Sequence, residues 1–193
     1  MAERLRIFVS ATTDLEAERA IIGRAMAGLP VQIGAEIRRT PVEGAKHDDI
    51  YELIANVDRF YFLMGSDITA PAGEEWHLAW QLERSIMPLR QGERLTPAAK
   101  EFLRGTVGLN WHHFRTTTEL ARLVTLDLVR ILNHPKNRYG LNVSELELIN
   151  VHAERIKRTT VTASQEPGGA EGGGVLLDMG HEEPWDGVAL DEM

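Results

Sequence analysis

The 193-residue chain contains no cysteine, which excludes disulfide bonds and thiolate metal sites. It has no apolar run approaching the roughly 18 residues that a membrane-spanning helix needs, and its first residues lack the apolar core of a signal peptide. The glycine-rich phosphate fingerprints G-x-G-x-x-G and G-x-x-x-x-G-K-[ST] are also missing, which disfavours a Rossmann dehydrogenase and a P-loop NTPase. We therefore expect a cytoplasmic protein with no metal site, no bound cofactor and no membrane partner.

The net charge of -8 comes entirely from one end of the chain. No Lys or Arg follows Arg158, whereas eight acids do, so residues 1–158 are formally neutral. Neither part has the clustered positive charge that duplex nucleic acid or an anionic membrane requires. The Gly-rich, acidic composition of residues 159–193 predicts a flexible tail. Bulky apolar residues in it, such as Trp185, leave two interpretations open: a disordered solubilising tail, or a motif within 175–193 that docks on a partner protein or a neighbouring subunit.

Strand-like and helix-like patterns alternate along the rest of the chain. Strands are expected near residues 5–9, 31–37, 59–64, 86–89 and 109–114, and helices near 14–28, 48–55, 74–84, from 97, 118–132 and 144–158. The stretch 59–64 is apolar at successive positions, as in a central parallel strand that is covered on both faces. The alternation predicts an α/β domain with a mainly parallel sheet over residues 1–135, followed by a helical extension over 136–158.

Polar residues follow two of the predicted strands. Ser10, Thr12 and Thr13 come after the first strand, and Gly65-Ser66-Asp67 comes after the apolar strand 59–64. The carboxyl edge of a parallel sheet is where such folds bind ligands, and hydroxyls with free N–H groups there can hold a ribose or a phosphate. Helix capping explains the hydroxyl residues too, with Thr12 or Thr13 as N-cap and Glu16 as capping-box partner.

Glu74 and Glu75 are predicted to open the helix near 74–84. Acids at a helix start interact favourably with its dipole, which by itself accounts for one of them. A carboxylate shielded by the neighbouring Trp76 can also act as a nucleophile or stabilise an oxocarbenium-like centre at a sugar C1′. The spacing alone favours capping over catalysis. The histidines at 47, 77, 112 and 113 form no recognisable metal set, and no esterase nucleophile elbow is present.

The run from Ile7 to Arg19 resembles the opening of a bacterial family known as domain of unknown function 4062, whose members look like relatives of TIR domains and nucleoside 2-deoxyribosyltransferases. The resemblance extends to about residue 90: Gly65 ends the apolar strand, Glu75 follows, and Ala79 lies four residues later. The chain departs from the pattern in three places, namely a shorter spacing between Thr12 and Asp14, Ser66-Asp67-Ile68 for Arg/Tyr-Tyr-Gly, and Trp76 for tyrosine or leucine. The resemblance implies a flavodoxin-like, TIR-like three-layer sandwich with about five strands.

The resemblance also implies a function. Glu75 would be the catalytic nucleophile, with Glu74 better suited to capping, and the nucleotide-binding residues would be Ser10, Thr12, Thr13, Gly65, Ser66, Asp67 and Trp76. The implied activity is cleavage of the N-glycosidic bond of NAD or a related nucleotide in bacterial conflict, defence or signalling, by an oligomer that assembles the site. The alternative is a non-catalytic module of the same fold that senses a nucleotide or docks protein partners through the fold and its acidic tail. A plain deoxyribosyltransferase ranks third.

Overall fold

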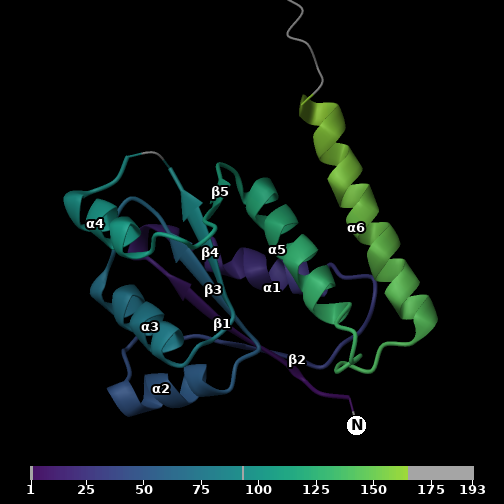
Figure 1. Cartoon of the computed structure of the whole chain (residues 1–193), viewed down its shortest axis with the longest axis horizontal. Coiled ribbons are helices and arrows are strands. Elements are labelled where there is room, and N and C mark those ends of the chain that lie inside the picture. The colour runs from purple at the N-terminus through teal and green to yellow at the C-terminus, as the bar shows by residue number, and fades with distance from the viewer. Residues whose placement is uncertain (1, 93, 165–193) are drawn as a thin grey trace, which may run out of the picture.

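The computed structural model describes residues 2–92 and 94–164. Five parallel strands form one sheet in the order β2-β1-β3-β4-β5 (Figure 1). The strands are β1 (Leu5–Ala11), β2 (Ala35–Arg38), β3 (Arg59–Met64), β4 (Ile86–Gln91) and β5 (His112–Phe114). The helices are η1 (Thr13–Leu15, 3-10), α1 (Arg19–Ala27), α2 (His47–Ala55), α3 (Ala70–Gln81), α4 (Pro97–Gly105), α5 (Thr117–Leu132) and α6 (Val143–Ser164). The predicted flavodoxin-like three-layer α/β sandwich is confirmed.

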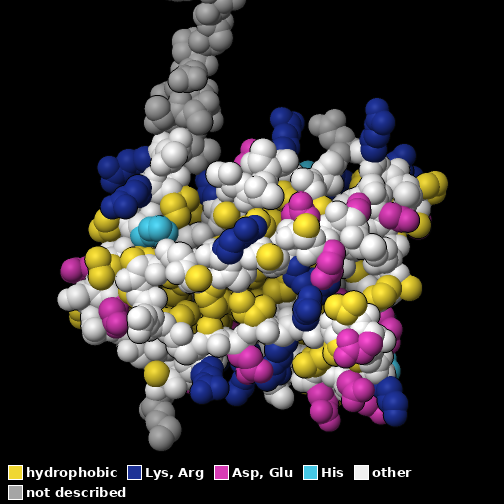
Figure 2. Space-filling view, turned by 180° about the vertical axis from the view of Figure 1, so that it is seen from behind, with side chains coloured by type: hydrophobic (Ala, Val, Ile, Leu, Met, Phe, Trp, Pro, Cys, Tyr) yellow, Lys and Arg dark blue, Asp and Glu magenta, His cyan; other side chains and the backbone are white. Residues whose placement is uncertain are grey.

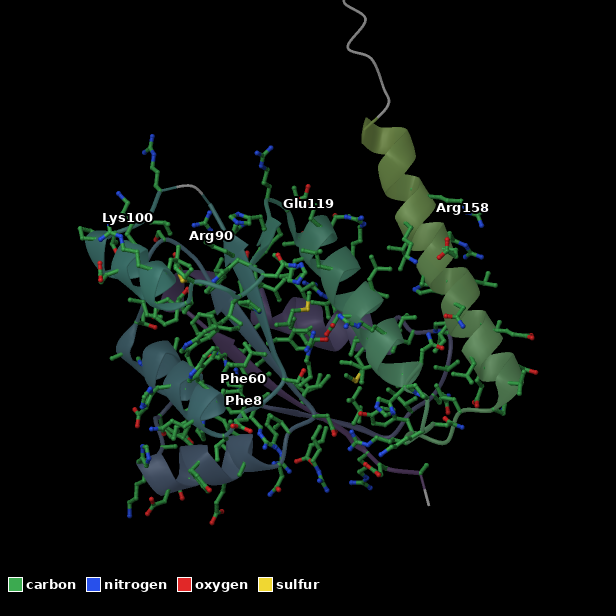
Figure 3. All side chains as sticks on the ribbon, viewed as in Figure 1. Phe8, Phe60, Arg90, Lys100, Glu119 and Arg158 are labelled. Carbon is green, nitrogen blue, oxygen red and sulfur yellow. The ribbon has the colours of Figure 1, made fainter. Side chains whose placement is uncertain are left out.

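Two hydrophobic layers cover the sheet because successive strand residues point to opposite faces. On one face, Val9 and Tyr61 belong to the buried cluster that also contains the inner sides of α1 and α5. On the other face, Phe8, Phe60 and Phe62 belong to the cluster formed with α2, α3 and α4. The rings of Phe8 and Phe60 stack with centroids 5.3 Å apart on this second face (Figure 3). The apolar run in β3 therefore reflects burial on both sides, as predicted.

The predicted start of α3 at Glu74 is wrong. The helix begins at Ala70, with Thr69 as N-cap and Pro71 in the first turn. Proline is tolerated there because the first N–H groups of a helix have no intrahelical acceptor. The Pro/Gly-bearing segment that suggests a loop is thus the first turn of the helix, and Glu74 lies in the second turn.

The predicted helix from Asp14 with a capping box is also wrong. Thr13–Leu15 form only a 3-10 turn, and α1 begins at Arg19. The Thr12 hydroxyl caps neither segment, since it donates to Asp14 and accepts from the N–H of Gly65. Glu16 pairs with Arg19 at 2.9 Å instead of binding the N-cap backbone. Contacts with the loop after β3 therefore determine the conformation of residues 12–16.

The edge strands are shorter than the sequence predicts. β2 begins at Ala35, where the first residue of β1, Leu5, is its partner, and β5 contains only three residues. Residues 31–34 have the alternating composition of a strand, but only Gly34 reaches β1, where its carbonyl accepts a hydrogen bond from the N–H of Leu5 at 2.9 Å. The residues before Gly34 precede the start of β1 at Leu5. Edge strands are paired on one side only, so the neighbouring strand sets their length.

The last helix, α6, packs on α5 through the buried residues Ile149 and Ala153. A reciprocal capping box between Asn142 and Glu145 fixes its start. It runs to Ser164 and so includes residues 159–164, which the sequence assigns to the tail. The predicted docking motif in 175–193 lies outside the described residues. Within residues 2–92 and 94–164, no helix combines the length and apolar character needed to cross a bilayer.

Candidate functional site

A buried carboxylate lies at the carboxyl edge of the sheet. Glu75, on the second turn of α3, has only 3% of its surface exposed. The hydroxyl of Thr40, in the segment that follows β2, donates a hydrogen bond to Glu75 Oε1. Ser10, near the end of β1, is fully buried, and its Oγ completes no hydrogen bond of acceptable geometry with any described residue. Three elements therefore contribute one polar side chain each to an enclosed position.

Opposing effects act on the pKa of the Glu75 carboxyl. Burial raises the pKa of the Glu75 carboxyl above its usual value, while the nearby hydroxyls of Ser10 and Thr40 and the positive charge of Arg19 partly offset this rise. The closeness of Ser10 thus favours the ionised carboxyl although no well-formed hydrogen bond joins them. Arg19 is itself held by the carbonyl of Val9 at 2.6 Å. Because its pKa is raised, the Glu75 carboxyl holds its proton to a higher pH than an exposed glutamate does.

A second network joins the loops after β1 and β3. Asp14 accepts hydrogen bonds from Thr12 Oγ1 at 2.6 Å, from the N–H of Ser66 at 2.8 Å and from Ser66 Oγ at 2.8 Å. Burial tends to raise the pKa of Asp14, but these donors outweigh it and lower the pKa. The strands β1 and β3 run on either side of the topological switch point of the sheet, so Asp14 closes the crevice where doubly wound folds bind ligands.

Gly65 is required at this junction by the close approach of Asp14. A Cβ atom on Gly65 would lie 2.1 Å from Asp14 Oδ2, and the backbone N–H of Gly65 donates to Thr12 Oγ1 at 3.0 Å. Four of the predicted nucleotide-binding residues thus divide between two places: Thr12, Gly65 and Ser66 bind Asp14 or one another, and Ser10 lies beside Glu75. Thr13 is exposed at the start of η1.

The remaining predicted site residues are Asp67, in the β3–α3 loop, and Trp76, on α3. Asp67 accepts hydrogen bonds from the N–H of Ile68 and from the hydroxyl of Thr96, which is the N-cap of α4. Trp76 is 6% exposed, and its ring lies 4.7 Å from that of Phe62 and 5.8 Å from that of Trp111. These contacts place Trp76 in the aromatic core between α3 and α4.

Glu74 has a different environment from its neighbour. It is exposed, and its Oε1 lies 2.9 Å from Nδ1 of His47, the first residue of α2. The predicted capping role of Glu74 is therefore wrong, because α3 begins at Ala70 with Thr69 as its N-cap and Glu74 lies in the second turn. One residue apart on the helix, Glu75 points into the protein and Glu74 links two helices at the surface.

Two surface hollows flank these networks. One lies beside β1 and β2 and is lined by Val9, Glu16, Arg19, Arg38 and Arg39. Two of these residues, Arg19 and Glu16, are the charged groups that shift the pKa of Glu75. The other is lined by Asp14, Gly65, Ser66, Gln91, Arg94 and Arg115, at the ends of β3, β4 and β5. Both hollows carry charges of both signs. Among the residues that the structure describes, no cluster of three or more His, Asp or Glu side chains is arranged to hold a metal ion.

Sequence reasoning missed Thr40, Asp14 and Arg19 as members of these networks. Thr40 follows β2, so the same sheet-edge argument that selected Ser10 would have selected it. Asp14 and Arg19 belong to the segment that carries the family resemblance, but their contacts depend on the positions of other loops.

Comparison with known proteins supports the fold. No protein-family model matches the chain, and no curated protein matches it. Among solved structures, the chain is similar to a TIR domain in the crystal structure of the RPS4 and RRS1 TIR domain heterodimer, with a TM-score of 0.50 and 8% sequence identity. The match covers 67% of this chain and 98% of the TIR domain. The fold is TIR-like. At this level of identity the similarity concerns the fold alone.

Proposed function

We propose that this protein cleaves the N-glycosidic bond of NAD or a related nucleotide, with Glu75 as its catalytic residue. The observation that carries the proposal is the buried Glu75 carboxylate beside the unpartnered hydroxyl of Ser10 at the carboxyl edge of a parallel sheet. This is the edge at which open α/β folds bind ligands. The resemblance of residues 5–90 to TIR and deoxyribosyltransferase relatives points to the same glutamate.

The chemistry requires an ionised carboxylate close to a ribose C1′. The carboxylate attacks C1′ or stabilises positive charge there, the C1′–N bond breaks, and the base leaves with the electron pair of that bond. Water then attacks C1′ and displaces the carboxylate where it has bonded there, and the proton that the water loses passes to the departed base or to solvent. Ser10 supplies a buried donor for a ribose oxygen, and Thr40 and Arg19 favour the ionised form of Glu75.

Access to Glu75 sets a condition on this activity. With 3% of Glu75 exposed and Thr40 bonded to its carboxylate, a ligand reaches the acid only when the residues around it rearrange. We infer that catalysis requires a rearrangement of the segment between β2 and α2, which oligomerisation would favour in a conflict or signalling effector.

The test is incubation of the full chain with NAD and with a panel of nucleosides and nucleotides, followed by mass spectrometry of the released bases. We expect E75Q to lower product formation by roughly 1,000-fold or more, as expected for loss of a nucleophile. The matched control is E74Q, which changes the adjacent exposed glutamate and should leave the rate within about threefold of the wild type.

Two results would contradict the enzyme proposal. One is an E75Q protein that retains the wild-type rate. The other is a wild-type chain that releases no base from any member of the panel, including in the presence of a crowding agent that promotes oligomerisation.

A second candidate function is a non-catalytic module that senses a nucleotide or binds a protein partner. It is favoured by the internal hydrogen bonds of Thr12, Ser66 and Asp67, which occupy the side chains that would otherwise hold a nucleotide. The TIR domain similar to this chain is part of a heterodimer, which agrees with a role in protein association. Calorimetric binding of NAD to both wild-type and E75Q chains, without product, would support this candidate over the enzyme.

A further inference from the structure

The edge strand β2 offers backbone hydrogen-bonding groups to a further strand. It comes first in the order β2-β1-β3-β4-β5, so β1 is its single neighbour in the described sheet. The carbonyl of Gly34 accepts from the N–H of Leu5, and backbone groups along a strand point alternately to its two sides. The backbone groups of Glu36 and Arg38 therefore face β1 as well, whereas the N–H and C=O of Ile37 point outward. An outward row of this kind is a template for strand addition.

The side chain of Ile37 lies on the face of the sheet that α1 covers. Its Cδ1 atom is 3.9 Å from the position that a Cβ on Gly23 would take, and the residue is 44% exposed. Beside it is a hollow of about 340 Å³, whose wall also includes the ion pairs of Glu16 with Arg19 and Arg39. Figure 2 shows hydrophobic side chains gathered near the middle of the face behind the view of Figure 1, where α1 lies. This face therefore has room for an apolar side chain next to Ile37.

The opposite face of β2 carries an acid and a base two positions apart. Arg38 Nη1 donates to the carbonyl of Leu53 on α2, and Arg38 Nε donates to Glu36 Oε1 at 2.8 Å. Arg6 on β1 lies 3.9 Å from Glu36. The side chain of Glu36 is 43% exposed and that of Arg38 is 19% exposed. Both charges are thus partly accessible to a strand that approaches the edge.

These charges favour one arrangement of two β2 strands. When two copies pair antiparallel about Ile37, its outward N–H and C=O meet those of Ile37 in the second copy, as in a hydrogen-bonded pair. Glu36 then lies opposite Arg38 of the second copy, in a non-hydrogen-bonded position where side chains are closest. A shift of the pairing by two residues would place Glu36 opposite Glu36 or Arg38 opposite Arg38, and like charges in these positions are destabilising.

We propose that two copies of this chain associate through β2, paired antiparallel about Ile37, so that their five-stranded sheets join edge to edge. A two-fold axis at Ile37 makes the contact the same patch on both copies. The two Ile37 side chains lie side by side on the α1 face, and two Glu36–Arg38 pairs form on the other. Because strands of four residues bury little surface, we expect a dissociation constant on the order of 10–100 µM. The association is separate from the activity proposed for Glu75, because it is measured without substrate.

Charge reversal tests the pairing of Glu36 with Arg38. Sedimentation velocity of the full chain over a concentration series measures association, and circular dichroism verifies folding. E36R and R38E each place like charges opposite one another, so each variant should weaken self-association at least tenfold. An equimolar mixture of the two variants pairs opposite charges again and should restore association to near the wild-type level. The control E147R reverses an exposed acid on α6, away from β2, and should leave association unchanged.

The absence of cysteine allows a second test of the same arrangement. Opposite residues in a hydrogen-bonded antiparallel pair have Cα atoms about 5.5 Å apart, which a disulfide can span. I37C should therefore form a covalent dimer on mild oxidation. The matched control A35C lies on the same face of the same strand, but its two copies would be roughly 14 Å apart and should not cross-link.

Three results would overturn the proposal. The first is a wild-type chain that remains monomeric at about 1 mM, well above the expected dissociation constant. The second is a dimer that E36R and R38E do not weaken, or a mixture of the two variants that does not restore association. The third is equal cross-linking of I37C and A35C, which would show that the copies do not meet at Ile37. The cysteine test also decides the matter if a charge reversal prevents folding.

Discussion

Replacing Gly65 with alanine should loosen the contact between the loops after β1 and β3. A Cβ atom at this position would lie 2.1 Å from Oδ2 and 2.4 Å from Cγ of Asp14, well inside van der Waals distance. Gly65 is not among the glycines of the described chain with a positive φ, so alanine meets no backbone strain there. The steric conflict is therefore with Asp14, and the carboxylate must move to admit the methyl group.

Moving Asp14 disrupts the three hydrogen bonds that its carboxylate accepts from Thr12 and Ser66. Each contributes about 0.5–1.5 kcal/mol net, so together they amount to about 1.5–4.5 kcal/mol. Alanine also lowers the conformational entropy of the unfolded chain, which stabilises the folded state by about 0.4–1 kcal/mol. We expect G65A to lower the free energy of unfolding by roughly 2–3 kcal/mol in urea denaturation followed by circular dichroism, which a domain of ordinary stability tolerates while remaining folded.

A double-mutant cycle isolates the contact. In a D14A background the carboxylate is absent, so G65A should change the free energy of unfolding by less than about 0.5 kcal/mol, or slightly stabilise the protein. The coupling between the two positions should then be about 2 kcal/mol. If G65A costs as much in D14A as in the wild type, the close approach of Asp14 is not the reason for glycine at this position.

Three further predictions concern stability. Burial raises the pKa of Glu75, so the folded state holds that proton more tightly than the unfolded state. Raising the pH above the ordinary glutamate pKa should therefore lower the free energy of unfolding of the wild type more than that of E75Q. Urea denaturation at a series of pH values measures this difference, and equal pH dependence of the two proteins would contradict the prediction. D127A should lower the free energy of unfolding by about 3–5 kcal/mol, because Asp127 is the buried partner of the Arg59 guanidinium. Y61F removes one hydrogen bond to the same carboxylate and should lower it by about 1–2 kcal/mol. Chemical denaturation of both variants measures the difference, and equal losses would refute the ranking. W76A should cost about 3–5 kcal/mol and W80A less than about half of that, because Trp76 is 6% and Trp80 54% exposed; calorimetry of both variants tests the difference.

The strand and helix patterns were sufficient for the architecture. The continuous apolar run at 59–64 predicts a central strand covered on both faces, and β3 is that strand. The spacing of leucines predicts a helix over 118–132, and α5 spans Thr117–Leu132. The spacing of apolar residues shows which face of a helix or strand is buried, so these patterns can be recognised without knowing what the element packs against.

The helix starts that the sequence predicts wrongly depend on contacts with distant parts of the chain. Pro71 and Gly73 are compatible with a loop and equally with the first turn of a helix, and only the packing of α3 on the sheet selects the helix. Thr12 has the chemistry of an N-cap, yet its hydroxyl binds Asp14 and the N–H of Gly65, which lies 53 residues away. A hydroxyl binds the partners that the assembled loops place beside it, and a local pattern does not specify them.

The sequence by itself determined a parallel α/β sheet, the place of Glu75 and Ser10 at its carboxyl edge, and the separation of a neutral body from an acidic end. Those features depend on periodicity, composition and chain order alone. Only the tertiary structure decided that Glu75 is buried and bonded to Thr40 while Glu74 reaches His47 at the surface. It also decided that Asp14 joins the two loops at the switch point. The reason is physical: solvent exclusion and hydrogen-bond partners arise from residues distant in the chain, and they determine the pKa of a carboxyl and its access to ligand.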